Sequence, residues 1–84
     1  MFKFENQPNV VKVRLNSIDR VKAFVNKTSD IDESMDLVSG RHEIDAKSIM
    51  GIFSLYLARD IYLVIHAEDN RVDEIKEILK DFIV

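Results

Sequence analysis

Ser48 is the side chain in this sequence whose type and position best suit chemistry with an outside molecule. It follows Lys47 and precedes an apolar run. A serine at the start of a helix can accept a hydrogen bond from a free backbone N–H group. The free N–H groups there also favour an anion, so a phosphate on the hydroxyl can be accommodated. We therefore predict that Ser48 caps a helix and can also accept a phosphate, with the charge of Lys47 beside it.

The apolar residues after Ser48 are too numerous for one short helix to bury. Ile49, Met50, Ile52 and Phe53 lie almost all the way round such a helix. Some of this apolar surface should therefore face water, and an exposed apolar patch usually marks a partner site. We predict a partner-binding patch formed by Lys47, Ile49, Met50 and Phe53.

Catalytic and metal chemistry have few candidate residues. A nucleophilic serine or cysteine needs a base, usually histidine. The chain has no cysteine, and its two histidines, His42 and His66, fall in predicted strands. We interpret both as surface histidines of the sheet, because neither belongs to a cluster with metal-ligand spacing. The carboxylates are scattered and no phosphate-binding glycine loop occurs, so we predict no enzyme activity, no metal and no cofactor.

Composition limits the chain to one small domain. It has 84 residues and a formal net charge of −3. A chain of this size buries only ~60% of the surface that its unfolded form exposes, so most apolar residues are needed for the core. The acidic balance argues against nucleic-acid binding, and no apolar stretch reaches the ~18 residues of a membrane span. We expect a single cytoplasmic domain over residues 1–84, with neither a nucleic acid nor a membrane as partner.

Hydrophobic periodicity predicts the elements that position these residues. Alternation of apolar and polar residues predicts four strands, at residues 10–15, 35–38, 41–46 and 61–67. Helical spacing predicts three helices, at residues 18–28, at residues 49–55 and in the segment after residue 70. The expected buried stripes of the first and last helices are Ile18, Val21, Phe24, Val25 and Thr28, and Val72, Ile75, Ile78, Leu79 and Phe82.

Short polar side chains predict where the helices begin. Asn16 and Ser17 precede the first helix, and Ser48 precedes the second. Asn70 is predicted to cap the last helix, with Asp73 reaching back as the acid of a capping box. Gly40 is predicted to adopt a positive φ in a hairpin turn.

The expected order is strand, helix, strand, strand, helix, strand, helix. This order predicts an α+β fold in which a four-stranded, mainly antiparallel sheet carries three helices on one face. Residues 1–9 are interpreted as a loose tail or a short strand arm, because Phe2 and Phe4 alternate with polar residues but Pro8 interrupts the pattern.

The segment around Ser48 carries a family resemblance. The run "DAKSIMGIFSL" closely resembles the K-S-I-M-G segment of HPr, the histidine-containing phosphocarrier of the bacterial sugar phosphotransferase system. The resemblance extends over roughly residues 10–82 and implies the HPr-like open-faced β-sandwich fold. It implies phosphorylation of Ser48 from ATP by an HPr kinase-type serine kinase. It also implies that Ile49, Met50 and Phe53, beside Lys47, contact protein partners such as the CcpA repressor.

The phosphocarrier site of the family is altered in this sequence. HPr has a G-[IL]-H-A-R-P-A motif where its first helix begins, and the corresponding stretch here is "LNSIDRVKA". Aligning the helix starts places Ser17 at the phosphate-accepting histidine, Asp19 at the arginine and Arg20 at the proline. A phosphoserine ester is not a high-energy donor, and Asp19 would repel a phosphoryl group. The sequence thus resembles a Crh-like member of the family that lacks the active-site histidine.

Three hypotheses follow for the function. The first is a non-catalytic regulatory protein that is phosphorylated at Ser48 and binds a partner through the adjacent patch. The second is a working phosphocarrier that accepts phosphate from enzyme I. The third is an interaction or self-association domain in which Ser48 is only a helix cap. The chain is expected to be a monomer or a weak dimer.

Overall fold

The computed structural model describes residues 7–84, so the interpretation of Phe2 and Phe4 lies outside the described residues. The elements are β1 (Val10–Val13), α1 (Ile18–Ser29), β2 (Ser34–Ser39), β3 (His42–Asp45), α2 (Ile49–Phe53), β4 (Ile61–His66), α3 (Asp69–Ile78) and a short 3-10 helix, η1 (Lys80–Phe82). This order of strands and helices is the order predicted from the sequence. Among residues 7–84, none of the helices has the length and hydrophobicity that a membrane span requires.

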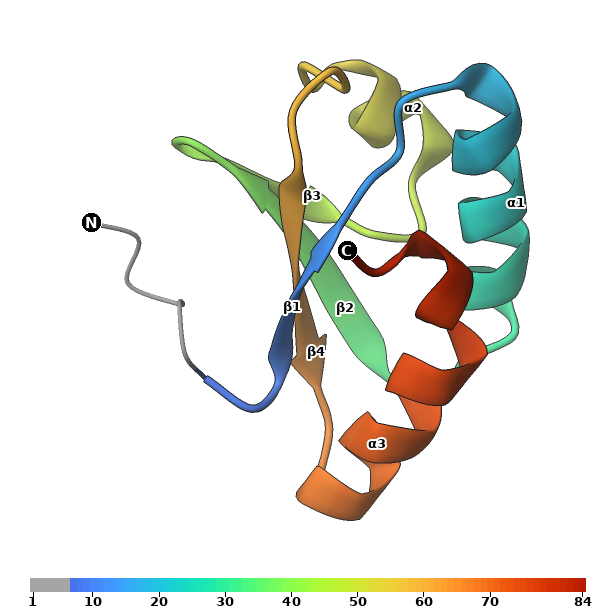
Figure 1. The fold of residues 1–84 in the computed structure, drawn as a ribbon, viewed down its shortest axis with the longest axis vertical. Helices are drawn as coiled ribbons and strands as arrows, with labels where there is room; N and C mark the ends of the chain where they lie inside the picture. The colour runs from blue at the N-terminus through green and yellow to red at the C-terminus, as the bar shows by residue number, and fades with distance from the viewer. Residues whose placement is uncertain (1–6) are drawn as a thin grey trace.

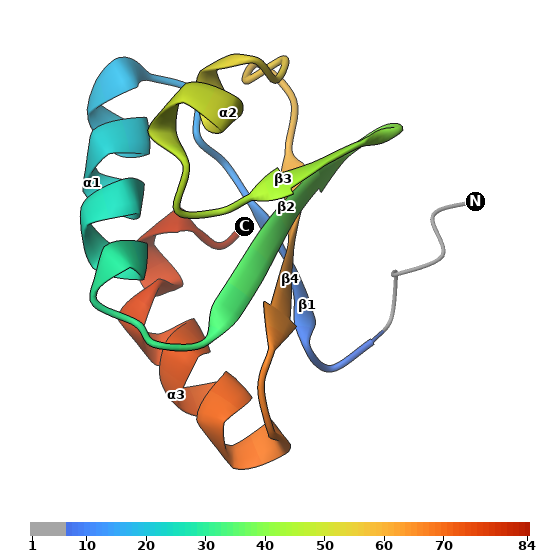
Figure 2. The same ribbon diagram turned by 180° about the vertical axis from the view of Figure 1, so that it is seen from behind.

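The four strands form one sheet in the order β1-β4-β2-β3, and every neighbouring pair is antiparallel. All three α-helices lie on the same side of this sheet, as the two opposite views show (Figures 1 and 2). The predicted α+β open-faced sandwich is therefore confirmed. Within residues 7–84, no helix lies on the other side of the sheet, which we call the open face.

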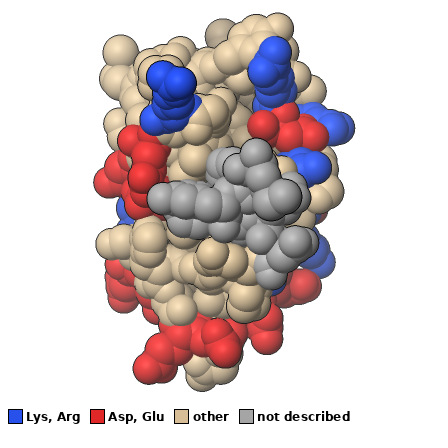
Figure 3. All heavy atoms as spheres, turned by 90° about the vertical axis from the view of Figure 1, so that its left-hand side faces the viewer, with Lys and Arg blue, Asp and Glu red and all other residues tan. Residues whose placement is uncertain are grey.

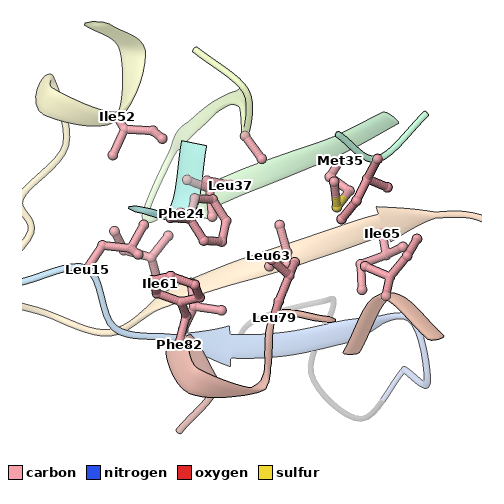
Figure 4. Close-up of a cluster of buried hydrophobic side chains, with 14 of the residues drawn as sticks. Leu15, Phe24, Met35, Leu37, Ile52, Ile61, Leu63, Ile65, Leu79 and Phe82 are labelled. Carbon is pink, nitrogen blue, oxygen red and sulfur yellow. The ribbon is translucent and has the colours of Figure 1, made fainter. Parts of the chain in front are cut away.

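The core lies between the sheet and the helices (Figure 4). Alternation along the inner strands directs Leu37 and Leu63 into this layer, where both are fully buried. Phe24 of α1 meets Phe82 edge to face, with 5.4 Å between the ring centroids. The core therefore joins α1, the sheet and the C-terminal segment.

Both edges of the sheet are protected against further strand pairing. At the β1 edge, Val13 forms a bridge with Ile83, and Val84 N donates to Lys12 O at 2.9 Å. The β3 edge is short and carries the exposed acids Glu43 and Asp45. Short, charged edge strands and covered edges are two ways in which sheets avoid aggregation.

Several predicted boundaries differ from the structure. The first strand ends at Val13, although Leu15 is still fully buried in the connection to α1. The second helix ends at Phe53, and Leu55 is buried in the turn that follows. In both places an apolar residue of a loop packs into the core. The periodicity pattern counts this residue as part of the neighbouring strand or helix, so the predicted element is too long.

The predicted cap of the last helix is wrong. The helix begins at Asp69 after Glu68, and no side chain caps it. Only two residues separate the end of β4 from α3, so the helix begins before Asn70 can take the cap position.

Two residues of the predicted buried stripes are also exposed: Ile18 by 62% and Ile78 by 40%. Ile18 is the first residue of α1, beyond the core, and Ile78 is offset around α3 from the line formed by Val72, Ile75 and Leu79. Both residues are therefore available to solvent, contrary to the prediction.

Candidate functional site

Ser48 is the N-cap of α2, as predicted. Its Oγ accepts a hydrogen bond from Gly51 N at 3.2 Å, and its carbonyl accepts from Ile52 N at 3.0 Å. The residue is half-buried, and the hydrogen bond from Gly51 N holds its hydroxyl in a defined position. A Cβ on Gly51 would lie 3.1 Å from Ser48 Oγ, so glycine is the residue that leaves this hydroxyl room.

Both the backbone and the side chain of Lys47 donate hydrogen bonds within the fold. Its backbone N–H donates to Asp45 Oδ1 at 2.8 Å, which helps to form the turn before Ser48. Its ammonium donates to the carbonyl of Ile31 in the connection between α1 and β2. The positive charge expected beside Ser48 is therefore held at the Ile31 carbonyl in this structure.

The apolar side chains of α2 divide between the core and the surface. Ile52 is fully buried and anchors the helix, and Ile49 is half-buried. Met50 is 77% exposed and Phe53 is 39% exposed. These two lie three residues apart, which places them on neighbouring positions of one helix face.

Sequence reasoning missed part of this apolar surface. Tyr56, just after α2, is 64% exposed, and the guanidinium of Arg59 lies 5.5 Å from its ring centroid. The exposed Ile18 begins α1, and the start of α1 lies at the same end of the molecule as α2 in both views (Figures 1 and 2). The position of Tyr56 directly after the predicted apolar run could have indicated that it belongs to this surface. No sequence feature indicated that Ile18 is exposed, because its helical spacing assigned it to the core.

Ser17 and Arg20 are engaged in structural contacts at the start of α1. Ser17 Oγ accepts from Arg20 N at 3.1 Å, which confirms Ser17 as the N-cap. The Arg20 guanidinium donates to Arg14 O at 2.9 Å and to Asp81 O at 3.1 Å, and it lies 5.2 Å from the Phe82 ring centroid. Arg20 thus ties the start of α1 to the C-terminal segment.

Both histidines are exposed strand residues, as interpreted from the sequence. His42 begins β3, and His66 ends β4 with its Nε2 2.9 Å from Asp36 Oδ2. The end of β4 and the start of α1 lie at opposite ends of the molecule (Figure 1). Neither histidine begins a helix, and no group of three or more His, Cys, Asp or Glu side chains among residues 7–84 is placed to hold a metal ion.

A separate ion pair joins α3 to the start of β2. Arg71 Nε lies 2.8 Å from Glu33 Oε2, and the hydrogen bond from Arg71 is the main cause that lowers the pKa of Glu33. The same bond raises the pKa of Arg71. This pair links elements of the fold and lies outside the Ser48 surface.

The fold is a small open-faced sandwich in which serines cap the first two helices. A scan against protein-family models matches residues 20–84 to PTS-HPr, described as the PTS HPr component phosphorylation site. The chain belongs to this family. The match begins at Arg20, so Ser17 lies just before it.

Solved structures show the same fold. The crystal structure of HPr-C-His from Thermoanaerobacter tengcongensis superposes with a TM-score of 0.66 at 19% identity, over 86% of this chain and 88% of that chain. A comparison with curated proteins gives no match. The chain is thus a phosphocarrier-like protein of the HPr family by sequence and by fold.

Proposed function

We propose that the chain is a cytoplasmic regulatory member of the HPr family. In this proposal Ser48 is phosphorylated by an HPr kinase-type serine kinase. Lys47, Ile49, Met50 and Phe53 then contact a protein partner, such as a repressor of the CcpA type. The observation that carries the proposal is the position of the Ser48 hydroxyl on the helix that exposes Met50 and Phe53.

The proposed reaction is a phosphoryl transfer from ATP. Ser48 Oγ attacks the γ-phosphorus, the bond from that phosphorus to the ADP oxygen breaks, and a base of the kinase takes the hydroxyl proton. Three charge-bearing oxygens then stand beside an apolar surface. A partner can therefore distinguish the two forms by the added charge.

The structure around Ser17 supports a regulatory role over a phosphocarrier role. Ser17 occupies the N-cap of α1, where the family resemblance places the phosphate-accepting histidine. Its hydroxyl accepts from Arg20 N, and the Arg20 guanidinium is bound to backbone carbonyls. A serine phosphate ester at this position would not pass its phosphoryl group onward.

Incubation with HPr kinase and ATP tests the regulatory proposal. We expect mass spectrometry to find one added phosphate on the wild type and none on Ser48→Ala or Ser48→Asn. Ser54→Ala is the matched control, because Ser54 lies at the other end of α2 and is exposed. Equal modification of the wild type and Ser48→Ala would contradict the proposal, as would no modification of either.

Incubation with phosphoenolpyruvate and enzyme I tests the phosphocarrier alternative. We expect no acid-labile phosphate on the chain. An acid-labile phosphate would show that a histidine still serves as acceptor, and the variants His42→Gln and His66→Gln would identify it.

Self-association through the same surface is the second candidate function. The exposure of Met50 and Tyr56 favours it, because large apolar side chains rarely gather on a surface without a partner. Sedimentation at several concentrations measures it. A dimer that Met50→Ser dissociates and Ser48→Ala leaves intact would favour this candidate, whereas a monomer at all concentrations would exclude it.

A further inference from the structure

The ammonium of Lys47 joins two separate connections of the fold. Lys47 lies between β3 and α2, directly before Ser48, and its side chain reaches the carbonyl of Ile31 between α1 and β2. The residue is half-buried. This hydrogen bond therefore ties the segment that carries Ser48 to the loop that follows α1.

The backbone around Lys47 is held by other hydrogen bonds. Lys47 N donates to Asp45 Oδ1 at 2.8 Å. Ala46 N donates to Met35 O at 2.9 Å, and the buried Thr28 hydroxyl donates to Ala46 O at 3.4 Å. These contacts fix the turn before α2 without using the ammonium. The ammonium can therefore change its acceptor while the turn stays folded.

The present acceptor of the ammonium is a neutral carbonyl. Within residues 7–84, no ion pair joins Lys47 to a carboxylate. The carboxylate of Glu33 is bound by Arg71, and this hydrogen bond is the main cause that lowers the pKa of Glu33. The charge of Lys47 acts on that pKa in the same direction but more weakly. Lys47 therefore carries a positive charge to which no anion is bound.

A phosphate on Ser48 would offer this ammonium a stronger acceptor. It carries a charge of about −1.5 to −2 and three acceptor oxygens. Hydrogen bonds between charged partners are roughly twice as strong as bonds between neutral ones. Consecutive Cα atoms lie about 3.8 Å apart, and the stem of a lysine is flexible. A phosphate on Ser48 therefore lies within reach of the Lys47 ammonium.

The distribution of charge also suits a phosphate at this end of the molecule. Asp and Glu side chains crowd the lower end of the face shown in Figure 3, whereas Lys and Arg side chains appear at its upper end. Helix α2 lies at the upper end in Figure 1, and the two views share the vertical axis. A phosphate beside α2 is thus far from the main gathering of acids on this face.

We propose that Lys47 is a latch that a phosphate on Ser48 releases: its ammonium leaves the carbonyl of Ile31 and binds the phosphate. The latch rests on the proposed function, because the phosphate must first be attached to Ser48. Its release has two effects. The phosphate gains a cationic partner beside α2, and the Ile31 carbonyl becomes free to bind water. A partner would thus meet a phosphate paired with Lys47, next to a loosened connection between α1 and β2.

A phosphorus NMR titration tests the latch on the chain with phosphoserine incorporated at position 48 during translation. No kinase is needed, so a failed kinase assay and a failed titration are distinguishable. An ammonium beside the phosphate favours the dianion. We expect the second pKa of the phosphate to be higher in Lys47→Met than in the unsubstituted chain. The difference should be about 0.2–0.7 pKa unit, the range for exposed ion pairs.

Lys27→Met is the matched control. Lys27 also donates its ammonium to a carbonyl, that of Ile78, so this variant removes the same charge from another part of the fold. It should leave the phosphate pKa near that of the unsubstituted chain. An equal pKa in Lys47→Met and the unsubstituted chain would overturn the latch, as would an equal rise in both variants.

The amide signal of Asp32 gives a second readout that needs no variant, in case Lys47→Met does not fold. The Asp32 nitrogen and the Ile31 carbonyl belong to one peptide group, so its chemical shift responds to the hydrogen bond at that carbonyl. We expect the phosphate on Ser48 to move this signal. Lys47→Met without phosphate should move it in the same direction. An Asp32 signal that the phosphate leaves unchanged would show that the ammonium stays at Ile31 and would overturn the latch.

Discussion

Replacing Ser48 by alanine should lower stability by removing one defined hydrogen bond. Ser48 Oγ accepts from Gly51 N at 3.2 Å, and this N–H group is among those at the helix start that have no partner within the helix. Loss of a serine N-cap costs about 1 kcal/mol, within a range of roughly 0.5–2 kcal/mol. For a domain of this size, 1 kcal/mol corresponds to a decrease in Tm of about 4–8 °C.

The variant Ser48→Asn distinguishes the role of residue 48 as a helix cap from the role of its hydroxyl as a phosphate acceptor. Asparagine caps a helix about as well as serine, but it has no hydroxyl to phosphorylate. Thermal unfolding followed by circular dichroism should therefore give Ser48→Asn a Tm near that of the wild type and Ser48→Ala a lower one. In the kinase assay, by contrast, both variants should remain unmodified.

The comparison has two outcomes that refute the reasoning. An unchanged Tm for Ser48→Ala would mean that the Oγ to Gly51 hydrogen bond contributes no net stability. An equal decrease in Tm for Ser48→Asn and Ser48→Ala would mean that the serine hydroxyl stabilises the fold through some contact other than the cap. Ser17→Ala removes the other serine cap and should lower the Tm by a similar amount. This variant shows whether the assay resolves an effect of this size.

Three further predictions concern contacts elsewhere in the fold. Arg20→Ala should lower the free energy of unfolding in urea by roughly 1–2 kcal/mol, and Arg20→Lys should not fully restore it, because an ammonium cannot reproduce the fork of the guanidinium. The pKa of Glu33 is lowered by Arg71, so the pair stabilises the fold above the unfolded pKa of Glu33. Its contribution is lost as pH falls through the acidic range. When the pH falls from neutral to about pH 3, the Tm of the wild type should therefore decrease by more than the Tm of Glu33→Gln. Equal decreases would contradict the stabilising role of the pair. Gly40 has a φ of 59°, so Gly40→Ala should destabilise the chain by about 1–2 kcal/mol in the same urea assay, and an unchanged midpoint would show that the turn relaxes.

Local patterns were sufficient to predict most of the elements and both serine caps. A strand that buries one face must alternate, and an N-cap needs only its own oxygen and the N–H group three residues on, as at Ser17 and Ser48. Information of this kind lies within a few residues of sequence. The resemblance to HPr predicted how these elements are arranged, as an open-faced β-sandwich.

Features that depend on distant residues were not predictable in this way. The exposure of Ile18 depends on where the core ends beneath α1, and the ammonium of Lys47 binds a carbonyl sixteen residues earlier in the chain. These features follow from tertiary placement, which no local pattern records.

The pairing of the C-terminal residues with β1 has a consequence for synthesis. Strand β1 is among the first described elements to leave the ribosome, yet its outer edge bonds to Ile83 and Val84. Phe82 also completes the core against Phe24. Contacts between residues so far apart in sequence form slowly and late. We therefore expect the domain to complete its folding only once residue 84 has emerged from the exit tunnel, so that nascent chains stalled before that point remain sensitive to protease.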